Sequence, residues 1–390
     1  MKLRAPFLAL LAGVLMTTTA TADATPRARD LGIPFMGMPG PLNAITDVGG
    51  VTVGQVTLKQ DLAGGKAVRT GVTAVLPRGA RTKDIPVFGA SFALNGNGEM
   101  TGTQWIDESG FIEGPILLTN THSVGVVRDA AIKWRVMQGG ADSSGYWWSL
   151  PVVAETWDGE LNDINGFHVK PEHVFEAIRA AKGGPVAEGG VGGGTGMICH
   201  EFKGGIGTAS RVVKVRDKSY TVGVLVQANY GVRETLTIAG IPVGQELTDD
   251  MIYHKPGGPN GDTGSIIILV ATDAPLLPHQ LKRMAKRAGM GLARVGSYAG
   301  NGSGDIFAAF STANANAGQD GAPMTVTMLA NDDMDPLFLG TVEATEEAIV
   351  NALIAGRDMQ GNMGSYVKGI PQAKLLAILK KHGRLLPAKK

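Results

Sequence analysis

The residue pair Gly264-Ser265 has the composition and setting of a self-cleaving peptide bond. Residues 254–264 are mostly glycine, proline and other turn-forming residues, whereas the apolar residues 266–271 follow the serine directly. Six consecutive apolar residues, four of them β-branched, predict a strand that is buried on both faces. The hydroxyl of a serine at such a junction can attack the carbonyl carbon of Gly264, and cleavage then makes Ser265 a chain start.

A freed Ser265 carries a hydroxyl group and an α-amino group on one residue. An α-amine has a pKa of about 7.7–8.0, so it can accept the hydroxyl proton near neutral pH. The same pattern also fits a loop that merely enters a core strand and begins with serine. Taken alone, the two residues favour this simpler interpretation.

Other polar residues stand beside strand-like runs, where active sites often form. Ser303 and Asp305 precede one apolar run, and Glu155 follows another. Asn229 ends a third run, and its amide can donate a hydrogen bond to a developing oxyanion. Each of these residues, taken separately, is equally compatible with an ordinary turn.

Several familiar motifs are absent from the sequence. The glycine-rich segment 189–196 has neither the Gly-x-Gly-x-x-Gly spacing nor a following Gly-Lys-Ser/Thr, so it predicts tight backbone packing rather than nucleotide binding. No Gly-x-Ser-x-Gly or His-Glu-x-x-His sequence occurs. His122 and His200 remain catalytic candidates, although a lone histidine near a strand end is more often structural. The single cysteine, Cys199, excludes an internal disulfide and a cysteine-based zinc site and predicts a small buried residue.

The start of the chain is typical of a secretory signal peptide. Lys2 and Arg4 precede a short apolar run, and small residues end the segment, which predicts a signal over residues 1–22 with cleavage after Ala22 or Ala24. We therefore expect export to the periplasm. The net charge of +1 and the low charged fraction of 18% give no reason to expect a nucleic-acid or membrane partner.

The elements that must position these residues mix strands and helices without regular alternation. This mixture favours a layered α+β sandwich with largely antiparallel sheets over a doubly wound sheet. The patterns predict strands over residues 72–76, 116–119, 152–154, 222–227 and 324–328. They predict helices from 171 or 172 to 182, from Pro278 to Gly289, and over 345–355 and 371–382.

Taken together, these segments resemble the family of D-stereospecific and β-peptidyl aminopeptidases, which are self-processing N-terminal serine hydrolases. The matching stretches keep their order along nearly all of the exported chain: 153–159, 161–163, 190–197, 226–231, 264–267, 271–279, 300–305 and 309–314. The resemblance implies a four-layer αββα sandwich like that of N-terminal nucleophile hydrolases, with its own connectivity. It also implies cleavage into an α chain, residues 23–264, and a β chain, residues 265–390, that stay together as αβ units of a homo-oligomer.

The resemblance also implies roles for individual residues. Ser265 matches the nucleophile, and its freed amine is the expected base. Ser303 matches a hydroxyl that hydrogen-bonds near the nucleophile, and Asp305 is the acidic residue two positions later, where some β-peptidyl members have glutamate. Asn229 matches the oxyanion donor, and Glu155 matches the carboxylate that holds the substrate's free ammonium group.

Trp157 stands where the D-aminopeptidase branch has a tyrosine, at the edge of the substrate-binding region. An indole offers one N–H donor, so a phenolic contribution to the oxyanion hole is lost. Together with the export signal, this favours the β-peptidyl branch. We therefore expect an aminopeptidase that removes N-terminal β-amino acids from short peptides, amides or esters without a metal or cofactor.

Three alternatives stay open at this point. An L-aminopeptidase or D-amino acid esterase/amidase would use the same scaffold and differ in substrate. An acyltransferase of related fold would pass the acyl group to an amine, although that class typically uses a threonine nucleophile. An uncleaved periplasmic binding protein would show one full-length band on a denaturing gel.

Overall fold

The computed structural model describes residues 26–83, 85–139, 148–252, 264–318 and 323–387. The predicted signal peptide, with its two cleavage points, lies outside this part of the chain, as does most of the loop before Ser265. No helix in the described ranges combines the length and apolar character needed to cross a bilayer.

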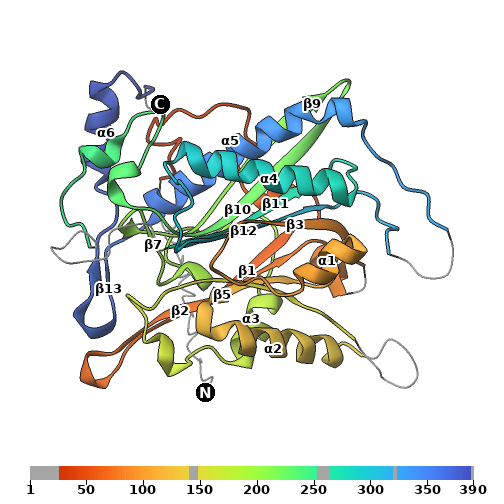
Figure 1. Cartoon of the computed structure of the whole chain (residues 1–390), viewed down its shortest axis with the longest axis horizontal. Helices are drawn as coiled ribbons and strands as arrows, with labels where there is room; N and C mark the ends of the chain where they lie inside the picture. The colour runs from red at the N-terminus through yellow and green to blue at the C-terminus, as the bar shows by residue number, and fades with distance from the viewer. Residues whose placement is uncertain (1–25, 84, 140–147, 253–263, 319–322, 388–390) are drawn as a thin grey trace, which may run out of the picture.

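Two sheets stack face to face between two helical layers, which makes a four-layer αββα sandwich (Figure 1). The larger sheet has the strand order β4-β3-β12-β11-β10-β9, with bounds β3 (Val87–Gly96), β4 (Phe111–Ile112), β9 (Gly205–Val215), β10 (Lys218–Asn229), β11 (Ser265–Thr272) and β12 (Gly304–Ser311). The smaller sheet has the order β1-β2-β5-β6, with bounds β1 (Thr52–Asp61), β2 (Ala67–Leu76), β5 (Ile116–Asn120) and β6 (Val152–Thr156). Most neighbours are antiparallel; β11 with β12 and β5 with β6 are parallel.

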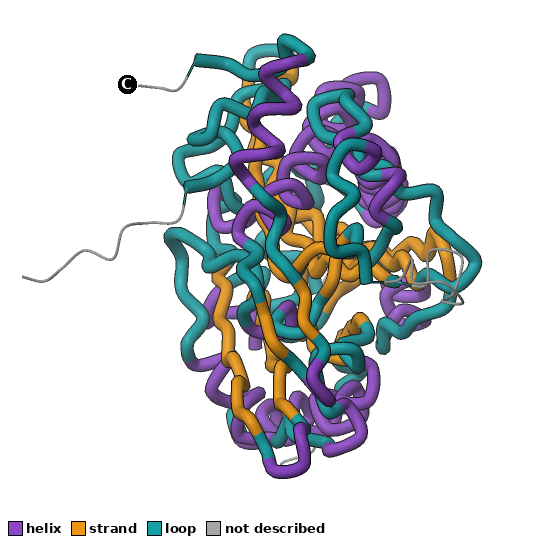
Figure 2. Tube along the Cα trace, turned by 90° about the vertical axis from the view of Figure 1, so that its left-hand side faces the viewer, coloured by secondary structure: helices purple, strands orange, loops and turns teal. Residues whose placement is uncertain are grey.

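Helices cover the outer face of each sheet. Figure 2 shows the stacking from the side, with strands in the interior and helices outside. The larger sheet is covered by α4 (Pro278–Arg294) and α5 (Asp335–Ala355), and the smaller sheet by α2 (Val124–Met137) and α3 (Pro171–Arg179). Smaller elements complete the fold: α1 (Thr103–Ser109), α6 (Gln372–Lys381), β7 (Ile198–Cys199), β8 (Phe202–Lys203), β13 (Met359–Gln360) and β14 (Tyr366–Val367).

Strand β11 confirms the prediction of a strand buried on both faces. All eight of its residues are buried. Its alternate side chains Ile266, Ile268 and Val270 join the core under α4 and α5, whereas Ile267 and Leu269 join the core between the sheets. Each fully buried aliphatic side chain stabilises the fold by about 1.5–3 kcal/mol, so β11 is a central source of stability.

The larger sheet interleaves strands from both sides of the Gly264-Ser265 bond. Strands β11 and β12 follow this bond in the chain and form the middle of the sheet. They are flanked by β3 on one side and β10 on the other, both from before the bond.

Most predicted elements are confirmed, with corrections to three helices and one strand. The helix predicted over 345–355 begins ten residues earlier, as α5 at Asp335, and the helix predicted to reach residue 182 ends at Arg179. Helix α4 does not end at Gly289 but continues to Arg294. Its Gly291 lets α4 approach α5, since a Cβ there would lie 2.5 Å from the Val342 carbonyl oxygen. Residues 324–328 are not a strand but an exposed segment; the Thr327 backbone exchanges hydrogen bonds with the Asn314 side chain.

Candidate active site

Ser265 is the first residue of β11 and lies between two neighbouring strand ends. It pairs with Asn229 of antiparallel β10 and with Gly304 of parallel β12. The Gly304 amide donates a hydrogen bond to Ser265 Oγ at 3.1 Å, and the serine is only 6% exposed. The hydroxyl is therefore held in place by the backbone of β12.

Gly264 fits its position because it has no side chain. A Cβ there would lie 2.1 Å from the Asn229 carbonyl oxygen and 2.6 Å from Tyr230 Cα. Real Cβ atoms do not approach backbone this closely, so only glycine allows the chain to enter β11 along this path.

Ser303 and Asp305 form a buried hydrogen-bonded pair at the start of β12. Ser303 Oγ donates to Asp305 Oδ1 at 2.7 Å, and both side chains are fully buried. The aspartate, one methylene shorter than glutamate, therefore reaches the hydroxyl. Because Ser303 precedes Gly304 directly, this pair lies next to the backbone that holds Ser265 Oγ.

The side chain of Asn229 has a fixed orientation. Its Oδ1 accepts a hydrogen bond from the Ile198 backbone N–H at 2.7 Å, which assigns the carbonyl half of the amide to that contact. The NH2 half therefore points away from Ile198. It is the half that can donate to an oxyanion formed beside Ser265.

Glu155 is nearly the last residue of β6, in the smaller sheet, and is 3% exposed. Its Oε1 accepts from the Glu99 backbone N–H at 2.9 Å, and its Oε2 accepts from the Thr121 hydroxyl. Burial raises the pKa of Glu155, opposed by these hydrogen bonds. The carboxylate is thus an oriented acceptor in a poorly solvated place, which suits an ammonium partner.

Gly98 connects Glu155 with the serine site. A Cβ added at Gly98 would lie 3.2 Å from Gly304 Cα and 3.3 Å from Glu155 Oε1. The residue that holds the Ser265 hydroxyl and the carboxylate of Glu155 therefore both border this one glycine. The two sheets bring the nucleophile and the carboxylate to the same end of the sandwich.

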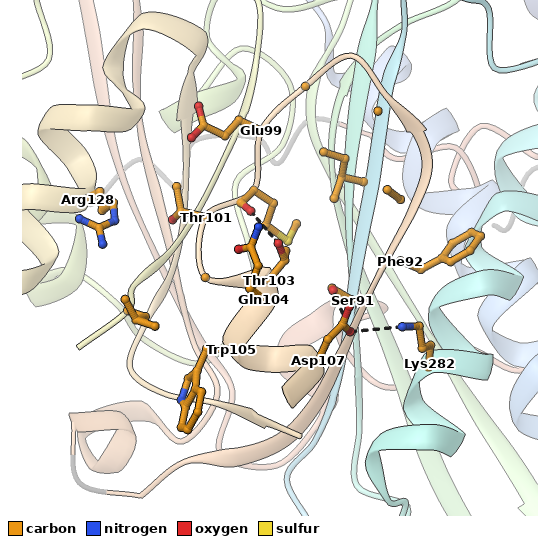
Figure 3. A pocket seen from close by; sticks show the side chains of 17 residues that line it. Ser91, Phe92, Glu99, Thr101, Thr103, Gln104, Trp105, Asp107, Arg128 and Lys282 are labelled. Atoms are coloured by element: carbon orange, nitrogen blue, oxygen red, sulfur yellow. Dashed lines mark hydrogen bonds and ion pairs between the residues drawn. The ribbon is translucent and has the colours of Figure 1, made fainter. Parts of the chain in front are cut away.

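A cavity of about 640 Å³ opens beside Gly98. Figure 3 shows Glu99 and Arg128 on one side of it and Phe92 and Lys282 on the other, with Lys282 paired to Asp107. Gly98 and Glu99 line this cavity, so it lies next to residues that border Glu155, although Ser265, Asn229 and Glu155 are not among its lining residues.

Trp157 lies just beyond β6 and is 44% exposed. Its indole covers Gly159, since a Cβ there would lie 2.5 Å from the ring. Among the contacts of the described residues, none joins this side chain to Ser265 or Asn229, so its substrate-binding role remains a prediction.

The glycine-rich segment 189–196 packs between the sheets, as predicted. The N–H groups of Gly192 and Gly193 donate to the Thr57 and Thr73 hydroxyls, and a Cβ at Gly193 would lie 2.3 Å from Gln227 Oε1. The segment is thus a close-packed internal turn.

The two histidine candidates lie in different environments. His122 is exposed and stacks on Phe167, whereas His200 is buried against Tyr230 and burial lowers the pKa of its imidazole to about 4. Cys199 is buried, as expected. Within the described ranges, no three His, Cys, Asp or Glu side chains cluster as metal ligands would.

Sequence reasoning did not find the residues that orient the candidate groups. Glu99 and Thr121 hold Glu155, Gly304 holds Ser265, and Ile198 holds Asn229. Three of these four contacts use a backbone N–H, which every non-proline residue has, so residue type carries no signal for them.

Nearly the whole chain is similar to proteins of known family and structure. The model of peptidase family S58 matches residues 43–367. The chain is 54% identical to the β-peptidyl aminopeptidase BapA of Sphingosinicella microcystinivorans, over 98% of this chain and 99% of that protein. It is 53% identical to a Burkholderia sp. β-aminopeptidase of known structure, with a TM-score of 0.83 over 92% of this chain and 99% of that chain. It is 47% identical to the L-aminopeptidase D-Ala-esterase/amidase of Ochrobactrum anthropi, a serine aminopeptidase described as a variant of the Ntn hydrolase fold, with a TM-score of 0.86 over 92% and 99% of the two chains.

Proposed function

Because the chain belongs to peptidase family S58 and is a serine-type aminopeptidase with an Ntn hydrolase fold, we propose that it cleaves itself before Ser265 and then removes N-terminal β-amino acids from short peptides, amides or esters. One observation carries the proposal: Glu155, from the smaller sheet, and Gly304, which holds the Ser265 hydroxyl in the larger sheet, both border Gly98. A nucleophile next to an ammonium-binding carboxylate is what an aminopeptidase requires.

In this mechanism the free amine of Ser265 accepts the proton of its own hydroxyl. The oxygen then bonds to the scissile carbonyl carbon, and the Asn229 NH2 group stabilises the oxyanion. The amine passes the proton to the leaving nitrogen, and the carbon–nitrogen bond breaks. Water then hydrolyses the ester on Ser265 and releases the amino acid.

Ser303 and Asp305 have a supporting role in this scheme. The Ser303 O–H donates to Asp305, so the lone pairs of the Ser303 oxygen can accept from the ammonium that forms on Ser265. Glu155 binds the ammonium group of the substrate and sets which amide bond reaches Ser265.

The proposed preference for β-amino acids rests on the activity named for two of the similar proteins. The Ochrobactrum relative is named for α-amino acid substrates, so these substrates are the alternative. Turnover of β-homoglycine, L-alanine and D-alanine p-nitroanilides by the same preparation separates the two. We expect the β-homoglycine substrate to have the highest kcat/KM. A higher value for either alanine substrate would assign the chain to the α-amino acid enzymes.

The processing of the chain is part of the proposal. We expect export with loss of residues 1–22, an α chain of residues 23–264, a β chain of residues 265–390, and homo-oligomeric αβ units. Intact mass measures both cleavage points, and light scattering measures the assembly.

The decisive experiment is Ser265→Ala, with Ser219→Ala, an exposed serine at the far end of β10, as the control. We expect Ser265→Ala to stay one chain on a denaturing gel and to be inactive, whereas the control gives two chains and normal turnover. An uncleaved Ser265→Ala chain that still hydrolyses substrate contradicts the proposal.

A further inference from the structure

The short hairpin of β7 and β8 contains a fully buried lysine, Lys203, which forms no ion pair among the described residues. Lys203 is 0% exposed, and within the described part of the chain no carboxylate lies within ion-pairing distance of its ammonium group. Burial lowers the pKa of Lys203 to about 7, although the charge of Asp158 acts to raise it. Such a group is costly to bury, so its retention requires specific hydrogen bonds.

Three backbone carbonyl groups provide these hydrogen bonds. Lys203 Nζ donates to the carbonyl oxygens of Met197 and Gly204 at 2.8 Å each and of Gly194 at 3.3 Å. All three donors of the ammonium group are thus used by one loop. The lysine ties the glycine-rich turn to the hairpin.

The hairpin that Lys203 holds also orients Asn229. The carbonyl of Met197 accepts from Lys203, and the next backbone N–H, that of Ile198, donates to Asn229 Oδ1 at 2.7 Å. Lys203 and the Gly204 backbone N–H, which donates to the same Met197 oxygen at 2.9 Å, therefore together fix the peptide plane between Met197 and Ile198, because the C=O and N–H of one peptide unit are coplanar. The carbonyl edge of this plane contacts the ammonium group, and the opposite, N–H edge contacts Asn229.

The same hairpin also forms hydrogen bonds with the backbone that follows Asn229, just after the end of β10. The His200 backbone N–H donates to the Tyr230 carbonyl oxygen at 2.7 Å, and His200 Nδ1 contacts the Val232 carbonyl oxygen at 2.9 Å. Both the side chain of Asn229 and the backbone that follows it are thus held by residues 197–203.

We propose that Lys203 is a positioning residue that acts through the peptide unit Met197–Ile198 to aim the Asn229 NH2 group at the oxyanion beside Ser265. The inference rests on the proposed function, in which Asn229 is the oxyanion donor. It predicts that the lysine contributes to kcat without touching the substrate, since it stabilises one orientation of Asn229.

The test is a double-mutant cycle on the processed enzyme, with kcat expressed per cleaved Ser265. Removal of an oxyanion donor lowers kcat by about 10²–10³-fold, so loss of its orientation in Lys203→Met is expected to lower kcat by about 10–100-fold. KM is expected to change less than threefold, because Glu155 and the cavity are intact. In the Asn229→Ala background, Lys203→Met is expected to cause no further loss of kcat.

Lys203→Gln is the second variant, since its amide retains two N–H donors for the carbonyl groups. Lys203→Gln is expected to lower kcat less than Lys203→Met does. In the Asn229→Ala background, Lys203→Gln is expected to cause no further loss of kcat. Should Lys203→Met fail to fold, the Lys203→Gln cycle gives the same comparison. Circular dichroism and the melting temperature check that each variant is folded.

Two results overturn the inference, and they are distinguishable. If the lysine substitutions lower kcat by the same factor with and without Asn229, Lys203 does not act through Asn229, while the proposed function stands. If Asn229→Ala alone leaves kcat unchanged, both the oxyanion role of Asn229 and the inference fail.

Discussion

The contact of Gly98 with both halves of the site makes Gly98→Ala an informative perturbation. The added Cβ would lie 3.2 Å from Gly304 Cα and 3.3 Å from Glu155 Oε1. Carbon contacts are favourable at about 3.5–4.0 Å, so the neighbours must move apart by about 0.3–0.8 Å. Gly98 does not have a positive φ, so alanine causes no backbone strain of its own.

The expected effect follows from this displacement. A misplacement of 1 Å can cost about a hundredfold in rate, so a shift of 0.3–0.8 Å corresponds to a loss of about 4- to 40-fold in kcat/KM. Stability is expected to be unchanged or slightly higher, because alanine lowers the entropy of the unfolded chain by about 0.4–1 kcal/mol. The prediction is therefore a loss of activity without a loss of melting temperature.

The assay compares kcat/KM and melting temperature of Gly98→Ala with those of Gly49→Ala. Gly49 is exposed, has no positive φ, does not line the cavity, and a Cβ there has no heavy atom within 4 Å. We expect wild-type activity from the control. Equal values of kcat/KM for the two variants would refute the reasoning, because the contacts of Gly98 would then have no catalytic consequence.

Two further predictions concern buried carboxyl groups. Glu155→Gln is expected to raise KM for substrates with a free amine by about 10–150-fold, the value of a hydrogen bond to a charged group, and to leave N-acylated substrates unaffected. Since the pKa of Glu155 is raised and the carboxylate must be ionised to bind ammonium, its contribution to the acid limb of kcat/KM is expected above the ordinary carboxyl range. This contribution is absent in Glu155→Gln, whereas the contribution of the Ser265 amine remains. Burial raises the pKa of Asp158 from 3.8 to about 7, so its contribution to stability is present below pH 3.8 and is lost as the pH rises to about 7. Asp158→Asn is expected to raise the melting temperature at pH 8 but not at pH 4, and an equal change at both pH values would contradict this.

The sequence predicts elements better than it predicts contacts between them. Strand β11 is evident because its apolar run is local, and α4 begins where Pro278 indicates. The predicted C-terminal end of α4 is too early because Gly289, which resembles a helix end, lies inside the helix, where a Cβ would lie 3.3 Å from Leu94 Cδ2; no local pattern shows this close packing.

The candidate site shows the same limit. Ser265, Ser303 and Glu155 stand at strand ends that the sequence marks, but the partners of Glu155 lie 56 and 34 residues away in the chain. Their approach depends on the stacking of two sheets, which is a property of the whole fold. The structure brings these residues together at one end of the sandwich, whereas Trp157 makes its described contact with Gly159.

The interleaved strands of the larger sheet have a consequence if the chain is cleaved before Ser265 as proposed. With β11 and β12 inserted between β3 and β10, the two fragments separate only if both flanking ladders of backbone hydrogen bonds are broken. Regaining the native state after full denaturation then becomes a second-order encounter of two polypeptides, whose yield depends on dilution, whereas the uncut precursor refolds as a single molecule. The proposed cleavage therefore makes recovery after denaturation depend on protein concentration, whereas recovery of an uncleaved chain is a first-order process.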